Sequence, residues 1–320
     1  MMMNPVYKRE LTVASRSIRL ALVFMAFNGI LAIVALFNMY SMVEQVKVTA
    51  EIQYSRFLEL YVFVSGIEFI MLMFIMPALT ASSISGERER QTLDLMLTTI
   101  MRPRDIVSGK LFSAMTTLLL LILSGIPVQA LVFVYGGITI PDMVMLLICY
   151  GAVALLAGGT GIFFSALVKR STVATVCTYA FIIILVAGTF AINSFSFKMS
   201  QNEINSYMST ISTVTKQATS GIFIYLLLFN PAVTFYTVIN EQAGSGSIRT
   251  TLEGWFGQHP DNFITENWTF LSLACQMVMA ILLIGAAIYF LTAVRQKSGG
   301  IKHEKKRKTA AKPLFKQGEQ

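Results

Sequence analysis

The segment GERERQTLDLMLTTIMRPRDIVSGK, residues Gly86–Lys110, holds nine charged residues in 25 positions of an otherwise apolar chain. Its apolar residues follow a helical spacing and charges surround them, as shown by Leu93, Met96, Leu97 and Ile100. Acidic residues come first, where the helix dipole favours them, and Pro103 closes the region. This pattern predicts one helix over Glu87–Thr98. The helix is either a solvated connection between membrane spans or a docking element for a soluble partner.

Composition sets the fold class. Hydrophobic residues make up 55% of the chain and charged residues 13%, whereas soluble domains carry about 25% charged residues. The hydrophobic runs do not alternate with polar residues as the strands of a membrane barrel do, so we expect an all-α integral membrane protein. Seven nearly charge-free runs are longer than the roughly 20 residues that a spanning helix needs: Leu20–Val43, Leu60–Ser85, Leu111–Pro141, Met143–Val168, Ser171–Phe197, Gln217–Asn240 and Asn267–Val294.

The distribution of Lys and Arg selects six spans from these seven runs. If Gln217–Asn240 stays on the outer side, 20 of the 25 basic residues lie in the cytoplasm, as positive-inside topology requires. A seventh span would carry the basic tail across the membrane, and Asn230-Pro231 interrupts this run at its centre. We therefore expect a re-entrant or interfacial outer helical segment before the last span.

These considerations define a multi-pass protein of the cell's inner or plasma membrane with both termini cytoplasmic. The transmembrane domain is expected to occupy residues 1–295, and a basic cytoplasmic tail residues 296–320. The expected spans are 20–43, 60–83, 111–136, 143–168, 172–196 and 268–294.

The sequence offers no arrangement of catalytic or metal-binding residues on one side of the bilayer. The two histidines, His259 and His303, are expected on opposite sides. Ser108-Gly109-Lys110 resembles the end of a phosphate-binding P-loop, but Arg104 and Leu111 occupy the positions that need Gly and Ser or Thr. We therefore expect no enzyme activity, metal or cofactor in this chain. Any energy for transport has to come from a separate polypeptide or from an ion gradient.

The run HEKKRK at His303–Lys308 would suggest nucleic-acid binding in a soluble protein. Next to the last span, we interpret it as an inner-leaflet anchor, because juxtamembrane basic residues attract anionic lipid. Membrane lipid is therefore an expected partner, and nucleic acid is not.

Glu68 is an acidic residue inside an expected span, and such residues are usually functional because ionisable groups are costly in a bilayer. It either contacts a cationic substrate, carries a proton in a gradient-driven carrier, or is hydrated or bonded to Asn28, Asn38 or Gln129. The candidate substrate path therefore consists of Glu68, Asn28 and Gln129.

Three features resemble the membrane subunit of the ABC-2 family of ATP-binding-cassette transporters. They are the opening NPVYKREL followed by Arg16 and Arg19, the block SGERERQTLDLMLTT-x-x-x-P-x-D-I-V-x-G-K that starts at Ser85, and the six-span plan with a long outer segment. The chain departs from the commonest pattern at Ile100-Met101, where a proline often follows the paired threonines, and at Gln91, where a glycine is frequent.

The resemblance implies an N-terminal interfacial amphipathic helix at about Pro5–Ser17 and a cytoplasmic coupling helix at Glu87–Thr98. It also implies an ABC ATPase subunit that binds ATP and Mg, a second permease copy or a related permease, and the export of an unidentified substrate. On the coupling helix, Leu93, Met96 and Leu97 are expected to form an apolar knob beside Thr92. The expected charged rim consists of Glu87, Arg88, Glu89, Arg90 and Asp94.

A secondary carrier that uses Glu68 remains the alternative function. Carriers of that class contain internal repeats and paired broken helices near the midplane. The sequence shows no convincing repeat, which favours the ABC permease.

Overall fold

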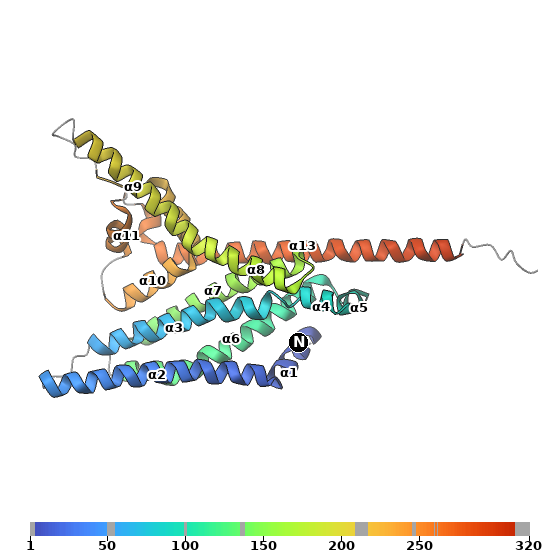
Figure 1. The fold of residues 1–320 in the computed structure, drawn as a ribbon, viewed down its shortest axis with the longest axis horizontal. Coiled ribbons are helices and arrows are strands. Elements are labelled where there is room, and N and C mark those ends of the chain that lie inside the picture. Colours follow the sequence, from blue (N-terminus) through green and yellow to red (C-terminus); the bar gives the residue numbers. More distant parts are fainter. Residues whose placement is uncertain are drawn as a thin grey trace, which may run out of the picture.

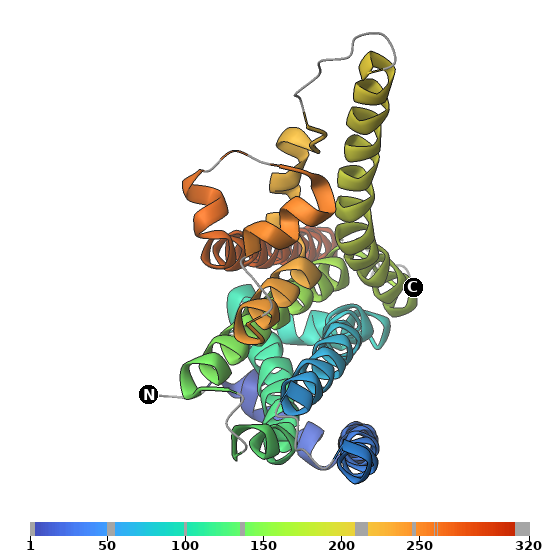
Figure 2. The same cartoon turned by 90° about the vertical axis from the view of Figure 1, so that its left-hand side faces the viewer.

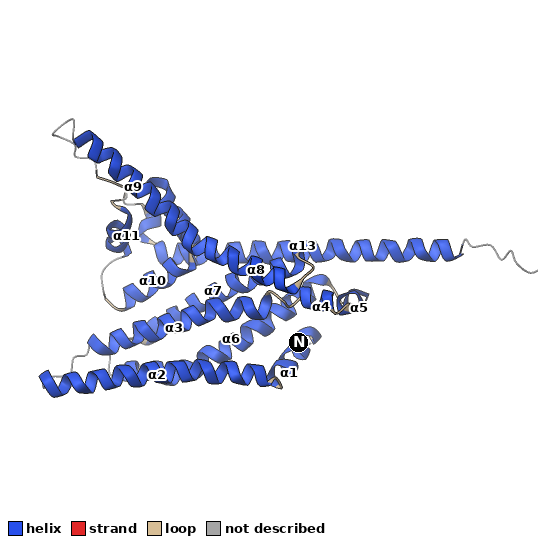
Figure 3. Ribbon diagram, in the orientation of Figure 1, coloured by secondary structure: helices blue, strands red, loops and turns tan. Residues whose placement is uncertain are grey.

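A computed structural model describes residues 4–49, 55–98, 101–134, 138–208, 217–244, 248–258, 260 and 262–310. Within these residues every regular element is a helix, which confirms the all-α class (Figure 3). In this described part of the chain, six helical segments are long and apolar enough to cross a membrane, or seven if the bent pair Gly221–Phe229 and Pro231–Gln242 is one span. The long elements are α2 (Ile18–Thr49), α3 (Ser55–Thr80), α6 (Pro103–Val134), α7 (Ile140–Leu167), the continuous unit α8 (Ser171–Ile183), η1 (Ile184–Gly188) and α9 (Thr189–Met208), and α13 (Trp268–Ala310).

Short helices connect or flank these long ones (Figure 1). The N-terminal helix α1 lies at one end of the bundle, close to the start of α6. Two short helices, α4 and α5, follow α3 at the same end. The short helices in the described residues are α1 (Pro5–Ser15), α4 (Ser85–Glu89), α5 (Thr92–Thr98), η2 (Gly221–Phe229), α10 (Pro231–Gln242), α11 (Ile248–Phe256) and α12 (Phe263–Glu266).

Helix α7 is the centre of the bundle. It contacts α3, α6, α8, α10 and α13, whereas α2 lies at the edge (Figure 2). Small residues line much of its buried surface, including Ala154, Ala157 and the pair Gly158-Gly159. Because apolar lipid gives little hydrophobic drive for helices to associate in a bilayer, close packing through small residues holds such helices together.

Helix starts are marked by residues that satisfy the free backbone N–H groups. At α7, the Asp142 carboxylate accepts hydrogen bonds from Thr139 N at 2.9 Å and from the Thr139 hydroxyl at 2.5 Å. At α6, the Asp105 carboxylate accepts one from Arg102 N at 3.2 Å, and Pro103 occupies the first helical position, where its missing N–H costs no bond.

The helices extend past several expected spans, because hydropathy marks the membrane-soluble part and not the helix end. Helix α6 begins at Pro103 instead of near residue 111, and α13 continues to Ala310 through the basic residues. The expectation that Pro103 closes the preceding helix is wrong. Helix α5 is described as Thr92–Thr98, residues 101 and 102 are not helical, and Pro103 begins α6.

The outer segment is broken at Asn230, where η2 and α10 meet at an angle of 89°. The Asn230 side-chain oxygen accepts hydrogen bonds from Ala232 N and Val233 N, which starts α10. Its amide group donates to Val186 O at 2.9 Å and to the Thr189 hydroxyl at 2.8 Å, which joins the break to the π-helical turn η1. A second hydrophobic core holds this region together: Ile224, Leu227, Leu228, Val233, Ile248, Leu252, Phe256 and Trp268.

The contact of α7 with the end of α3 allows a stability test at two glycines of the same helix. A Cβ at Gly161 would overlap the Thr80 side chain and lie 3.1 Å from Ala81 N, whereas a Cβ at Gly151 would meet nothing within 4 Å. We expect Gly161→Ala to lower the free energy of unfolding by about 1–3 kcal/mol, the usual cost of overpacking. Gly151→Ala should be neutral or slightly stabilising, because alanine favours a helix by about 1 kcal/mol.

Thermal unfolding of both purified variants in detergent measures the difference. Equal melting temperatures for Gly161→Ala and the unmodified protein would contradict the close contact between α3 and α7.

Candidate functional site

The charged segment after α3 forms two helices, so the expectation of one helix over Glu87–Thr98 is wrong. Helix α4 ends at Glu89 and α5 begins at Thr92. Between them Gln91 has a φ of 59°, in the left-handed region where a helix commonly ends. The backbone N–H of Arg90 turns back to the carbonyl oxygens of Gly86 and Arg88.

Two residues of the expected apolar knob, Leu93 and Met96, pack against the protein's own core. Leu93 is only 2% exposed and belongs to the main hydrophobic core, against which Met96 also packs. Leu95 instead presents an apolar side chain outward, with 69% of its surface exposed. The side chains of Leu97 and Asp94 lie outside the described part of the structure. A stripe at helical spacing identifies a face that is buried, but not whether a partner or the same chain buries it.

Two residues of the expected rim, Arg88 and Glu89, fasten α4 to the connection between α7 and α8. Arg88 donates to Ala166 O at 3.0 Å and to Val168 O at 3.4 Å, where the end of α7 leaves carbonyl groups to be satisfied. Glu89 accepts from the backbone N and the hydroxyl of Ser171 at 3.0 and 2.7 Å, at the start of α8. These charges therefore position α4 on two spans.

The Ser165 hydroxyl of α7 makes a further connection at the same place. It accepts hydrogen bonds from Ile84 N and Ser85 N, both at 2.9 Å. These N–H groups lie at the start of α4, where a helix has no internal acceptors for them. The path of the chain from α3 into α4 is therefore fixed by α7.

A third rim residue, Glu87, takes part in an ion-pair cluster with Lys110. The Lys110 ammonium lies 2.9 Å from a Glu10 carboxylate oxygen and 3.6 Å from one of Glu87, and the Lys110 side chain is only 5% exposed. The Thr92 hydroxyl also donates to the Glu87 carboxylate. The cluster joins α1, α4 and α6, whereas Arg90 is exposed.

Glu68 lies inside the bundle, and its environment resolves the alternatives for its bonding. It is 1% exposed, and its Oε2 accepts a hydrogen bond from Gln129 Nε2 at 2.6 Å. The Tyr150 hydroxyl lies 3.3 Å from the same oxygen and donates to Ser65 O at 2.8 Å. The amide of Asn28, by contrast, donates to the Ser124 hydroxyl at 2.9 Å. The structure therefore brings Gln129 to Glu68 but gives Asn28 another partner.

The second carboxylate oxygen, Oε1, is buried and has no hydrogen-bond partner among the described residues. It lies against Gly125, where an added Cβ would overlap it. Sequence reasoning missed Ser65 and Tyr150 as neighbours of Glu68. A signal for Ser65 was present on α3, because Tyr61, Ser65 and Glu68 recur at helical spacing within an apolar span. The position of Tyr150 depends instead on how α7 packs against α3.

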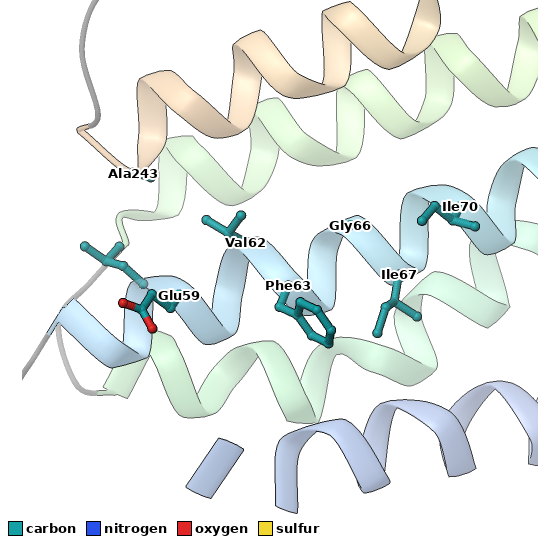
Figure 4. Close-up of a pocket in the computed structure, with 8 residues that line it drawn as sticks. Glu59, Val62, Phe63, Gly66, Ile67, Ile70 and Ala243 are labelled. Carbon is teal, nitrogen blue, oxygen red and sulfur yellow. The ribbon is translucent and has the colours of Figure 1, made fainter. Parts of the chain in front are cut away.

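The opposite face of α3 borders a cavity of about 510 Å³ (Figure 4). It is mainly apolar, with Val62, Phe63 and Ile70 along the helix and Glu59 near one end. Glu68 does not line this cavity. An ionic contact between Glu68 and a molecule there would require α3 to rotate.

A double-variant cycle tests whether Glu68 and Gln129 depend on each other. Gln129→Leu removes the amide donor and leaves a buried carboxyl group, so we expect the free energy of unfolding to fall by about 1–3 kcal/mol. Combining Gln129→Leu with Glu68→Leu removes both polar groups and should restore part of that loss. Thermal unfolding in detergent provides the measurement.

The matched control combines Glu68→Leu with Asn28→Leu, whose effects should add because Asn28 bonds to Ser124 instead. Additive effects for the Glu68 and Gln129 pair would show that their hydrogen bond contributes nothing to stability.

A comparison with known protein families identifies the family of the chain. The family described as "ABC-2 family transporter protein" matches residues 48–295, well over half of the 320-residue chain. The matched region includes the segment α4–α5, the Glu68 site and the broken outer segment. A search of curated proteins gave no match. The chain is a multi-pass membrane protein and belongs to the ABC-2 transporter family.

Proposed function

We propose that this chain is the membrane-spanning permease subunit of an ABC exporter, driven by a separate ATPase subunit that binds ATP and Mg. The observation that carries the proposal is the segment α4–α5. It combines an outward apolar side chain, Leu95, with charged residues that fasten α4 to the spans. Export is the direction that the resemblance to the family implies.

Docking through α5 gives the ATPase subunit a specific point of attachment. Buried apolar anchors supply most of the affinity in protein interfaces, and charged rims mainly adjust encounter and orientation. Leu95 is suited to the anchor because it is exposed on a short helix. Arg90 is exposed in the turn between α4 and α5 and is suited to the rim of the interface.

Movement of α4 would reach the spans through two routes. Arg88, Glu89 and Ser165 connect it to α7 and α8, and Glu87 connects it through Lys110 to α6 and α1. Because α7 packs against most of the bundle, displacement of its end would also move α3 and α13. Closure of two ATPase subunits could thus rock the two membrane halves.

The proposed assembly contains two such permeases, either two copies of this chain or one copy with a related chain. Both termini and α4–α5 are placed in the cytoplasm, because that arrangement puts 20 of 25 basic residues on the inner side. The least buried spans are α2 and the α8–α9 unit, with 17% and 11% of their most apolar windows buried. The exposed surface of these two spans is therefore large enough to contact both lipid and a second permease.

The alternative, a carrier driven by an ion gradient, rests on Glu68 and its unpartnered carboxylate oxygen. It gives no role to the exposed Leu95. Recovery of an ABC ATPase with the tagged protein from membranes would favour the permease, and gradient-driven uptake without any ATPase would favour the carrier.

Two leucines of α5 separate docking from folding. Leu95→Asp places a charge on an exposed position, so the protein should fold and insert but bind its ATPase more weakly, by about 2 kcal/mol or more. Leu93→Asp buries an unpaired charge and should destabilise the permease itself, by about 3–5 kcal/mol. Co-purification of the ATPase and ATP turnover in reconstituted membranes measure the first effect, and thermal unfolding measures the second.

Arg90→Glu serves as the control, since an exposed ion pair contributes only about 0–1 kcal/mol. Normal ATPase binding and normal turnover in Leu95→Asp would remove the coupling role from α5.

Cysteine labelling tests the proposed orientation. In a variant without Cys149, Cys177 and Cys275, a single cysteine at Asn202 should react with an impermeant maleimide on intact cells, because Asn202 is exposed on α9 in the outer region. A cysteine at Ser298 should react only after permeabilisation. The reverse pattern would show that the protein is inserted the other way round.

A further inference from the structure

A groove of about 400 Å³ lies between α1, α2, α3 and α6, at the end of the bundle that carries α4 and α5. Its volume is within the range of small-molecule sites in proteins, about 300–1,000 Å³. One end is polar and is bordered by Glu10, Lys110 and Ser113. The rest is apolar and follows the spans past Leu20, Ile75 and Leu121.

The groove has apolar side chains at its margin that face outward. Val13 is 61% exposed, and Val23 and Leu79 are each 37% exposed. In a protein that crosses a bilayer, the exposed apolar surface of a span faces lipid. The groove is therefore accessible to the acyl chains of the membrane along α2 and α3.

Charges of both signs meet at the polar end. Lys110 is almost completely buried between the carboxylates of Glu10 and Glu87, and Arg9 of α1 also acts electrostatically on Glu87. The Glu10 side chain keeps 32% of its surface exposed, so its carboxylate can accept a further hydrogen bond. Of these charged groups, Glu10 and Lys110 line the groove, and one carboxylate beside one cation favours a headgroup that itself carries both signs.

We propose that this groove binds phosphatidylethanolamine as a resident lipid, with an acyl chain along α2, α3 and α6 and the headgroup at Glu10 and Lys110. The primary ammonium donates to the Glu10 carboxylate, and the phosphate lies on the side of Lys110. A lipid without a cation would bring its phosphate close to the Glu10 carboxylate with no ammonium of its own to offset the repulsion. A choline headgroup has the same net charge but no N–H to donate.

The bound lipid completes the packing beneath α1. Two direct bonds already hold this helix on α6: Asn4 Nδ2 donates to Asp105 O at 2.6 Å, and the hydroxyls of Tyr7 and Thr116 are 3.0 Å apart. Between those contacts and α2 the groove would otherwise be a gap, and side chains along a gap lose their packing contacts. The inference requires only that the spans lie in a bilayer, so it does not depend on an ATPase partner.

Native mass spectrometry of the purified full-length protein tests the proposal with three lipids that share palmitoyl and oleoyl chains and carry ethanolamine, choline or glycerol headgroups. The unmodified protein should bind the ethanolamine lipid about tenfold more tightly than the other two, the value of one charge-assisted hydrogen bond. Glu10→Gln should abolish that preference. Glu44→Gln is the matched control, because Glu44 pairs with Lys47 at the far end of α2.

A second variant keeps the test decisive if Glu10→Gln fails to fold. Ala78→Trp places a large ring in the apolar part of the groove, at an exposed position away from the ion pair, and should weaken binding of all three lipids. Equal binding of ethanolamine and choline lipids by the unmodified protein would overturn the proposal. Retained preference in folded Glu10→Gln, or unchanged binding in Ala78→Trp, would overturn it as well.

Discussion

The close contact between α3 and α7 is the constraint on which both candidate sites depend. Gly158 and Gly161 let the two helices approach, because a larger residue at either position would collide with Met76 or Thr80. At one end of this contact Ser165 reaches the start of α4, and towards the other Tyr150 reaches Glu68. One helix pair therefore sets the geometry of the charged segment and of the buried carboxyl group.

The same contact explains how α4, the first helix of the charged segment, is fixed to the spans. Ile84 and Ser85 are fully buried, so their backbone N–H groups need partners within the protein. Side chains of α4 and α7 satisfy one another's helix ends, through Ser165 in one direction and Arg88 in the other. Helix α5 is then presented from a fixed base, with Leu95 outward and Leu93 inward.

The spans and the broken outer segment were predictable because each depends on local composition. Run length and hydropathy identify helices that cross a bilayer, and Asn230-Pro231 marks a break wherever it occurs. The break at Gln91 was not predicted, although the family pattern often has glycine there and the left-handed φ of 59° explains that preference. The direction of Leu93 and the bond from Tyr150 depend on how distant helices pack, which sequence periodicity does not specify.

Two basic residues at the end of the bundle that carries α4 and α5 have a structural role besides the proposed orientation of the chain. Lys110 and Arg88 are among the residues that the proposed topology puts on the inner side, and both also hold helices together. A cation that is almost buried, as Lys110 is, requires carboxylates close by. Those carboxylates come from α1 and α4, so this one cation draws together the helices that border the groove beside α1 and the segment α4–α5.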